Sequence, residues 1–156
     1  MSSPILSIQP IRANGQVRSK SSVLVELMKS EEVSILIVDD EEPIRKLLAS
    51  YLSADYTCVT AKNAEEAKNL LAASSFNLVL TDITMPGASG IELCEHINTA
   101  HPGTLVVIVS AKVGEPNFIG AERGHAVDFV AKPFDLSHVL KTVKSALAYQ
   151  VKNNDD

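Results

Sequence analysis

Short apolar runs alternate with longer amphipathic stretches through most of the chain. An apolar run bounded by turn residues predicts a buried strand, and apolar positions three and four apart predict a helix that packs on one face. Strands are expected at 34–38, 57–60, 76–81, 104–109 and 127–131. Because helical stretches separate these strands, the pattern predicts an α/β fold: a doubly wound, five-stranded parallel sheet with strand order 2-1-3-4-5 and five helices.

Local signals mark where the predicted helices begin. Pro43 lies in the first turn of the helix that follows the first strand, where its missing N–H costs nothing. Asn63 has the character of an N-cap, and Ser89–Glu92 form a capping-box pattern. Asp135 is expected to cap the last helix. The stretch 117–123 shows little apolar periodicity and predicts only a weak helix.

The two ends of the chain differ from its middle. Pro10, Asn14-Gly15 and several serines interrupt any periodicity before the first strand. We therefore expect residues 1–32 to be a flexible N-terminal extension, with a docking or dimerisation segment as the alternative. The folded domain is expected over 33–150, followed by a polar tail at 151–156.

Composition narrows the class of protein. The chain has 156 residues, 46% of them hydrophobic, which suffices for one domain with a packed core. No apolar run approaches a membrane-spanning length and no secretory signal is visible, so we expect a cytoplasmic protein. Two cysteines suit a reducing compartment. The net charge of −5 argues against direct nucleic-acid binding, which usually needs a basic face.

Polar residues follow four of the predicted strands at their carboxyl ends. They are Asp39 and Asp40 after the first strand, Asp82 after the third, Ser110 after the fourth and Lys132 after the fifth. In open α/β sheets, ligands bind at the carboxyl ends of the strands. We therefore expect these side chains to form one site.

The charges of these side chains predict phosphoryl chemistry. Carboxylates of Asp39, Asp40 and Asp82 would repel one another strongly in partly desolvated surroundings. A hard divalent cation offsets such charge, and Mg²⁺ suits a site of carboxylates, a carbonyl and water. Lys132 adds a fixed positive charge and Ser110 a hydroxyl, so the site would hold a tetrahedral dianion. A carboxylate there can itself act as the nucleophile and become an aspartyl phosphate.

The sequence resembles the receiver domains of bacterial response regulators in two-component systems. The resemblance rests on four motifs, in this order along the chain: Val38-Asp39-Asp40-Glu41, Thr81 to Gly90, Ser110-Ala111 and Lys132-Pro133-Phe134. Each motif is weak alone, but together they are specific. The similarity covers roughly Ser34 to Tyr149 and implies the flavodoxin-like fold of receivers over the domain at 33–150.

The resemblance also implies a role for each matching residue. Asp82 would be the phosphoacceptor. Asp40, Asp82 and the backbone carbonyl of Thr84 would bind Mg²⁺, with Asp39 acting mainly through water. Lys132 would pair with a phosphoryl oxygen. With Ser110, Asp82 and Lys132 would form the catalytic set.

A conformational switch is part of the same resemblance. Ser110 would bond to the phosphoryl group and shift toward it, and Phe129 matches the switch aromatic that would then turn inward. The Lys132-Pro133 bond is expected to be cis. One residue departs from the family pattern: His125 stands four residues before Phe129, where the family often has Gly.

The implied function is a phosphorylation-switched signalling module and not an enzyme with an external substrate. The phosphoryl group would come from a histidine kinase or a histidine phosphotransfer protein. A downstream effector protein or domain would bind the surface of the helix at 117–123, the strand at 127–131 and the last helix. A homodimer, where one forms, would use the same surface. No direct nucleic-acid or membrane contact is expected.

Simpler interpretations stay open. Asp39 and Asp40 would serve equally well as caps on the helix that follows. Lys132 could be a solvated surface residue, and Phe129 an ordinary core aromatic. Two other functions are a receiver-like protein-interaction scaffold that is not phosphorylated, and a flavodoxin-like cofactor-binding domain. The latter would need a Gly-rich phosphate loop after the first strand, where acids stand instead.

Overall fold

The computed structural model describes residues 12–13, 16–17, 20, 32–113 and 126–154. The chain divides into two compact units, residues 1–32 and 33–156. In the first unit, β1 (Arg12–Ala13) pairs antiparallel with β2 (Gln16–Val17). The sequence pattern gives no sign of this pair, because strands of two residues are too short to show periodicity. The prediction that residues 1–32 are flexible falls mostly on residues that the structure does not describe, and it stays a prediction.

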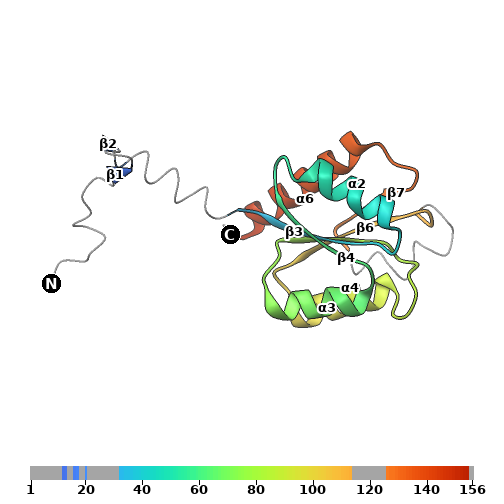
Figure 1. The fold of residues 1–156 in the computed structure, drawn as a ribbon. Coiled ribbons are helices and arrows are strands. Elements are labelled where there is room, and N and C mark those ends of the chain that lie inside the picture. The colour runs from blue at the N-terminus through green and yellow to red at the C-terminus, as the bar shows by residue number, and fades with distance from the viewer. Residues whose placement is uncertain (1–11, 14–15, 18–19, 21–31, 114–125, 155–156) are drawn as a thin grey trace. The chain divides into compact units, whose positions relative to one another are not determined.

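The second unit is built on a five-stranded sheet (Figure 1). Its strands, in spatial order, are β4 (Thr57–Ala61), β3 (Ser34–Val38), β5 (Leu78–Thr81), β6 (Leu105–Ser110) and β7 (Asp128–Ala131). Every neighbouring pair is parallel. The predicted α/β fold and strand order 2-1-3-4-5 are therefore confirmed.

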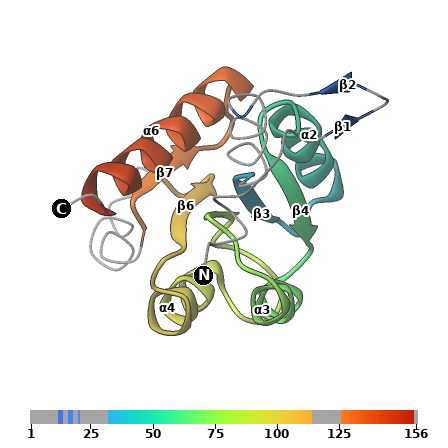
Figure 2. The same cartoon turned by 90° about the vertical axis from the view of Figure 1, so that its left-hand side faces the viewer.

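Helices cover both faces of this sheet. The helices α2 (Glu42–Leu52) and α6 (Leu136–Asn154) lie on one face, and α3 (Ala64–Ala73) and α4 (Gly90–Ala100) on the other (Figures 1 and 2). Four helices thus flank the sheet among the described residues; the weak helix expected at 117–123 lies outside them. The last helix continues to Asn154 and so includes most of the predicted polar tail. No helix in the described ranges is long and apolar enough to cross a membrane.

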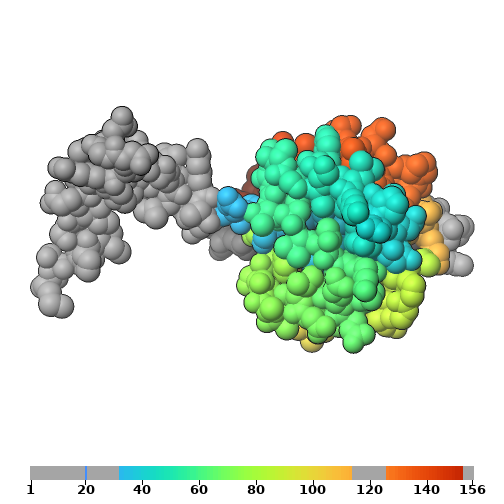
Figure 3. Space-filling model, viewed as in Figure 1, coloured from blue at the N-terminus to red at the C-terminus, as the bar shows by residue number. Residues whose placement is uncertain are grey.

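Two core clusters fill the space between the sheet and its helices. Alternate residues of β3 point to opposite faces, as the pleat requires. Ile35 and Ile37 belong to the cluster under α2 and α6, whereas Leu36 and Val38 belong to the cluster under α3 and α4. In the space-filling view, α2, the edge strand β4 and α3 face the viewer, with orange atoms of α6 at the upper right (Figure 3). The central strands are buried on both faces, so functional polar groups can gather only at their ends.

The predicted helix starts are largely found. The side chain of Asn63 accepts a hydrogen bond from the amide of Glu66 at 2.8 Å. The side chain of Ser89 accepts one from the amide of Glu92 at 3.2 Å. Both bonds satisfy amides that have no partner within the helix. They fix the first turns of α3 and α4 beside the sheet.

Candidate functional site

The site lies where the central strands end. Asp39 follows β3 and Asp82 follows β5, and the two strands are neighbours in the sheet. Both acids are buried, with exposed fractions of 2% for Asp39 and 7% for Asp82. Acids that deep are rare unless something compensates their charge. The simple interpretation of Asp39 as a surface helix cap is therefore insufficient.

Lys132 supplies one compensating charge. Its Nζ lies 2.8 Å from Oδ2 of Asp39 and 2.8 Å from Oδ2 of Asp82. The side chain is 12% exposed, so it is not a solvated surface lysine. The Lys132-Pro133 peptide is cis, as predicted. The backbone of Lys132 is held by a bond from its amide to the carbonyl of Ser110 at 3.0 Å.

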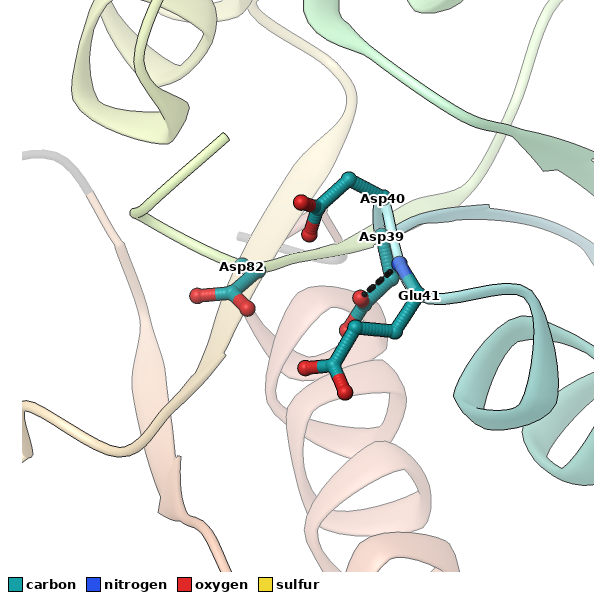
Figure 4. Close-up of side chains that lie close together, drawn as sticks. All are labelled: Asp39, Asp40, Glu41 and Asp82. Carbon is teal, nitrogen blue, oxygen red and sulfur yellow. Dashed lines mark hydrogen bonds between the residues drawn. The ribbon is translucent and has the colours of Figure 1, made fainter. Parts of the chain in front are cut away.

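A cluster of four carboxylates surrounds this ammonium group. Asp39, Asp40, Glu41 and Asp82 each offer an oxygen, and these atoms lie within 4.8 Å of one another. In Figure 4, Asp82 lies beside the three acids of the loop after β3. A set of oxygen donors alone is the ligand chemistry that Mg²⁺ prefers. The residues present therefore fit a divalent metal. The cluster brings together Asp39, Asp40 and Asp82, and their role as metal ligands stays a prediction.

The electrostatics of the buried pair show how strongly the charges are coupled. Burial raises the pKa of the Asp39 carboxyl above its ordinary value, although hydrogen bonds from Lys132 and the Glu41 amide pull it down. Burial alone would lower the pKa of Lys132, but the hydrogen bonds and charges of Asp39 and Asp82 outweigh it and raise that pKa. Lys132 is thus firmly cationic, and the site keeps an excess of negative charge.

The backbone around Asp82 is closely fitted. The amide of Thr84 donates to Oδ1 of Asp82 at 3.2 Å, so both carboxylate oxygens have partners. A Cβ added to Gly90 would lie 1.9 Å from the backbone carbonyl oxygen of Asp82, and the Gly90 amide donates to the carbonyl of Ile83 at 2.8 Å. The first residue of α4 therefore packs directly on the peptide that carries the carboxylate. Only glycine fits there.

The two predicted switch residues lie on neighbouring strands. Ser110 ends β6, is buried, and its hydroxyl oxygen accepts a hydrogen bond from the amide of Lys112 at 3.2 Å. Phe129 on β7 is half-buried and packs against the core cluster under α3 and α4. His125, the departure from the family pattern, lies outside the described residues.

No role is predicted from sequence for two residues near the site, of which Glu41 is named only as part of a motif and Arg45 not at all. Glu41 joins the carboxylate cluster, and its Oε1 lies 3.6 Å from Nζ of Lys132. Arg45, in the first turns of α2, donates from Nη1 to the backbone carbonyl of Asp39 at 2.8 Å. Glu41 could have been suspected because it directly follows the acid pair. Arg45 carries no such signal, since a basic residue on an amphipathic helix is usually solvated.

The cysteines take no part in this chemistry. Both are free. Cys94 is fully buried in the core, and burial raises the pKa of its thiol to about 12, so this side chain is unreactive. Cys58 is only half-buried, and burial raises the pKa of its thiol as well.

The chain is similar to known proteins along most of the second unit. Over 113 residues it is 40% identical to the response regulator protein PilR of Pseudomonas aeruginosa, a match that covers 72% of this chain and 25% of PilR. The first curated relatives are longer proteins, and the matches span a quarter to a half of their lengths.

Solved structures show the same fold. A CheY-like response regulator receiver domain protein from Methanospirillum hungatei matches with a TM-score of 0.74 and 28% identity, covering 79% of this chain and 99% of that one. The response regulator TrrA from Thermotoga maritima, solved with Mg²⁺ and BeF, matches with a TM-score of 0.66 and 31% identity, covering 73% and 98%. Residues 35–144 match the family described as the response regulator receiver domain. The chain belongs to that family.

Proposed function

We propose that this receiver domain is switched by transfer of a phosphoryl group to Asp82. One observation carries the proposal: the buried carboxylate of Asp82 is bonded to Lys132 inside a cluster of carboxylates that fits a metal. A buried acid with a perturbing cation and further acids beside it is the arrangement expected where charge develops during a reaction.

The chemistry is a direct transfer between two nucleophiles. A carboxylate oxygen of Asp82 attacks the phosphorus of a phosphohistidine on the partner. The new O–P bond forms as the P–N bond breaks, and the histidine nitrogen leaves with its electron pair. Lys132 exchanges its bond to Asp82 for one to a phosphoryl oxygen while it keeps Asp39 as a partner. Positioning and charge compensation are what such a transfer requires of a protein.

Mg²⁺ is the proposed metal. Asp40, Asp82 and the backbone carbonyl of Thr84 would bind it directly, with Asp39 acting mainly through water. When bound, the ion would neutralise negative charge on the carboxylates and on the transferred group. The donor set of oxygens supports this choice, as does the fact that TrrA was solved with Mg²⁺ and BeF.

The proposed switch uses Ser110 and Phe129. The Ser110 hydroxyl oxygen accepts from the Lys112 amide, which leaves its proton free to donate to a phosphoryl oxygen. A shift of Ser110 toward Asp82 would leave space that Phe129, half-buried on the adjacent strand, would fill from its side. A conformational change on β6 and β7 would then report the state of Asp82.

The proposed partners follow from this switch. A histidine kinase or histidine phosphotransfer protein would supply the phosphoryl group. A downstream effector protein or domain, or a second copy of the chain, would bind the surface of β7, α6 and the segment between β6 and β7. We expect no direct contact with nucleic acid or a membrane, and no turnover of an external substrate. Two free cysteines are consistent with the cytoplasm as the location.

Labelling of the purified protein tests the phosphoacceptor. Acetyl phosphate or phosphoramidate should phosphorylate the wild-type protein only when Mg²⁺ is present, detected as an added phosphate by intact-protein mass spectrometry. Asp82→Asn should abolish labelling, because the amide is not a nucleophile. Asp55→Asn is the matched control, since Asp55 is an exposed acid away from the cluster and its loss should change nothing.

Two results would contradict the proposal. Labelling that persists in Asp82→Asn would move the phosphoacceptor elsewhere. A wild-type protein that is never labelled, and that binds no Mg²⁺, would favour an unphosphorylated protein-interaction scaffold instead.

A further inference from the structure

Arg45 contacts the backbone on both sides of Asp40. Its guanidinium Nη1 donates to the carbonyl of Asp39 at 2.8 Å, on the peptide that precedes Asp40. The backbone amide of Arg45 also donates to the carbonyl of Glu41 at 3.0 Å, but this is the first hydrogen bond of α2, which any residue except proline would make at this position. The contact that depends on the arginine side chain is the bond to the Asp39 carbonyl, which fixes the loop just before Asp40. A residue that does not bind the metal itself can still orient the side chains that do.

Other bonds hold the neighbours of Asp40 but not its carboxylate. The amide of Asp39 donates to the carbonyl of Ala61 at 3.2 Å, and Oδ1 of Asp39 accepts from the amide of Glu41 at 2.9 Å. The side chain of Asp40 is exposed, and it has no hydrogen bond to another side chain within the described ranges. Its direction toward Asp82, visible in Figure 4, therefore depends on the loop backbone.

We infer that Arg45 is a positioning residue that aims the Asp40 carboxylate at the metal. The inference rests on the proposed Mg²⁺ site and adds to it a residue that touches neither metal nor phosphate. Arg45 holds the carbonyl of Asp39, the loop keeps its shape, and Asp40 stays within reach of the other carboxylates before any metal arrives. The metal then meets ligands that are already oriented, so less ordering is needed on binding.

The sign of the effect distinguishes positioning from simple electrostatics. Arg45 is a cation beside an acidic cluster, so removing its charge alone would strengthen the binding of a divalent cation. Removing its grip on the loop would weaken that binding, because a misdirected ligand costs affinity. The inference therefore requires that loss of the Arg45 side chain weakens metal binding, even though loss of its positive charge alone would strengthen it.

Manganese binding to the full chain provides the test. Mn²⁺ is titrated into metal-free protein and followed by electron paramagnetic resonance, which needs no phosphorylation. Arg45→Met should weaken binding about 10-fold, the usual loss when a residue that orients a metal ligand is removed. Arg45→Lys, which keeps a donor and the charge, should recover most of the affinity.

Lys46→Met is the matched control. Lys46 lies next to Arg45 on α2 but is exposed and pairs with Glu42 at 2.8 Å, away from the loop carbonyls. This variant removes the same charge and should leave Mn²⁺ affinity unchanged or slightly higher. Arg45→Met binding as tightly as Lys46→Met, or more tightly than wild type, would overturn the inference.

A measurement without metal separates this inference from the proposed function. In metal-free protein, hydrogen exchange of the Glu41 amide should be at least several-fold faster in Arg45→Met than in Lys46→Met, because the loop is released. A wild-type chain that binds no Mn²⁺ would overturn the metal site. Unchanged exchange at Glu41 would overturn the role of Arg45 whether or not metal binds. Should Arg45→Met fail to fold, Arg45→Gln, whose amide is too short to reach the Asp39 carbonyl, replaces it in both measurements.

Discussion

The two ends of the sheet carry different polar side chains: a cluster of charged groups lies at the carboxyl ends of its strands, and neutral groups lie at the amino ends. At the carboxyl ends of β3 and β5, four carboxylates lie within 4.8 Å of one another. Lys132 contacts three of them, Asp39, Glu41 and Asp82. At the amino ends, neutral side chains pair with backbone groups of β3 and of the segment that leads into β5. One end holds an excess of negative charge, and the other holds neutral hydrogen bonds.

The amino end shows how strand starts are joined. Oδ1 of Asn77 accepts from the amide of Ser34 at 2.9 Å, and the Ser34 hydroxyl donates to the carbonyl of Ser75 at 3.1 Å. The hydroxyl of Thr104 donates to the carbonyl of Phe76 at 2.8 Å. The bonds of Asn77 and Thr104 satisfy groups that folding has partly taken from water, whereas the bond of the Ser34 hydroxyl is exposed. None of them leaves a charge that could react.

This difference predicts where stability and chemistry separate. Substitutions at the amino end should cost stability and leave metal binding and phosphorylation intact. Substitutions of polar side chains at the carboxyl end should impair metal binding, phosphorylation or the response to it at little cost in stability, or with a gain. Proteins commonly keep unfavourable interactions at functional sites and offset their cost in stability elsewhere in the fold. The following experiments test this division, from the largest expected effect to the smallest.

Gly90→Ala should have the largest effect because it violates backbone packing at the carboxyl end. The new Cβ would lie 1.9 Å from the carbonyl oxygen of Asp82, so α4 or the strand end must move. We expect a loss of about 3 kcal/mol in the free energy of unfolding, measured with urea. Labelling of Asp82 should fall as well, since its carboxylate shifts relative to Lys132.

Gly103→Ala is the control at the amino end. A Cβ added to Gly103 meets nothing within 4 Å. Its free energy of unfolding should stay within about 0.5 kcal/mol of wild type. Equal losses from the two substitutions would show that the contact between Gly90 and Asp82 has no special weight.

Asn77→Ala and Asp39→Asn should change stability in opposite directions. Asn77→Ala leaves the Ser34 amide without its acceptor and should cost about 1–2 kcal/mol, with Mn²⁺ affinity unchanged. Asp39→Asn removes a buried charge. Because burial raises the pKa of Asp39, the folded state binds its proton more tightly than the unfolded chain does, and ionisation of Asp39 opposes folding.

The pH dependence checks that sign. For a carboxyl whose pKa is raised, the penalty is absent below the ordinary pKa and grows as pH rises toward the folded-state value. Asp39→Asn should therefore be at least as stable as wild type in urea at neutral pH, and the gain should vanish below about pH 4. A clear loss of stability at neutral pH would mean that Asp39 holds the fold together through Lys132.

Most of the fold could be predicted because the centres of β3, β5 and β6 are apolar runs, although the exact ends of β5 and β6 could not. The prediction starts the third strand too early: Phe76 is buried in the core, but the strand begins at Leu78. A buried apolar residue just before a strand has the same pattern in sequence as a residue within the strand, so the two cannot be told apart. The fourth strand likewise extends to Ser110, which the sequence placed just beyond it.

The candidate site was predictable where chain order alone brings residues together. Asp39, Asp82 and Lys132 meet because parallel strands end at one edge, and strand ends can be seen in sequence. The contact between Arg45 and Asp39 could not be predicted, since it depends on the rotamer of a long side chain on the next helix. The sequence shows Gly90 as part of a capping pattern. Its close approach to the Asp82 carbonyl could not be predicted, because it depends on how α4 packs against the end of β5.

The finest comparison is between the two ends of a single strand. Thr104 directly precedes β6 and Ser110 is its last residue, and each carries a hydroxyl group. Thr104→Ala removes the bond to the carbonyl of Phe76 and should cost about 1 kcal/mol, with a normal response to phosphorylation. Ser110→Ala removes only an acceptor for the Lys112 amide, so its cost should be smaller.

Ser110→Ala should instead interrupt signalling along the sheet. Beryllofluoride with Mg²⁺ is added to each variant, and amide chemical shifts of β7 are followed by NMR. Wild type and Thr104→Ala should show chemical-shift changes around Phe129. Ser110→Ala should bind the analogue at Asp82 without these changes, because it has no hydroxyl at the end of β6 to bond to the analogue. If β7 shifts equally in all three proteins, Ser110 does not couple Asp82 to Phe129. The contrast between the two ends of β6 would then concern stability alone.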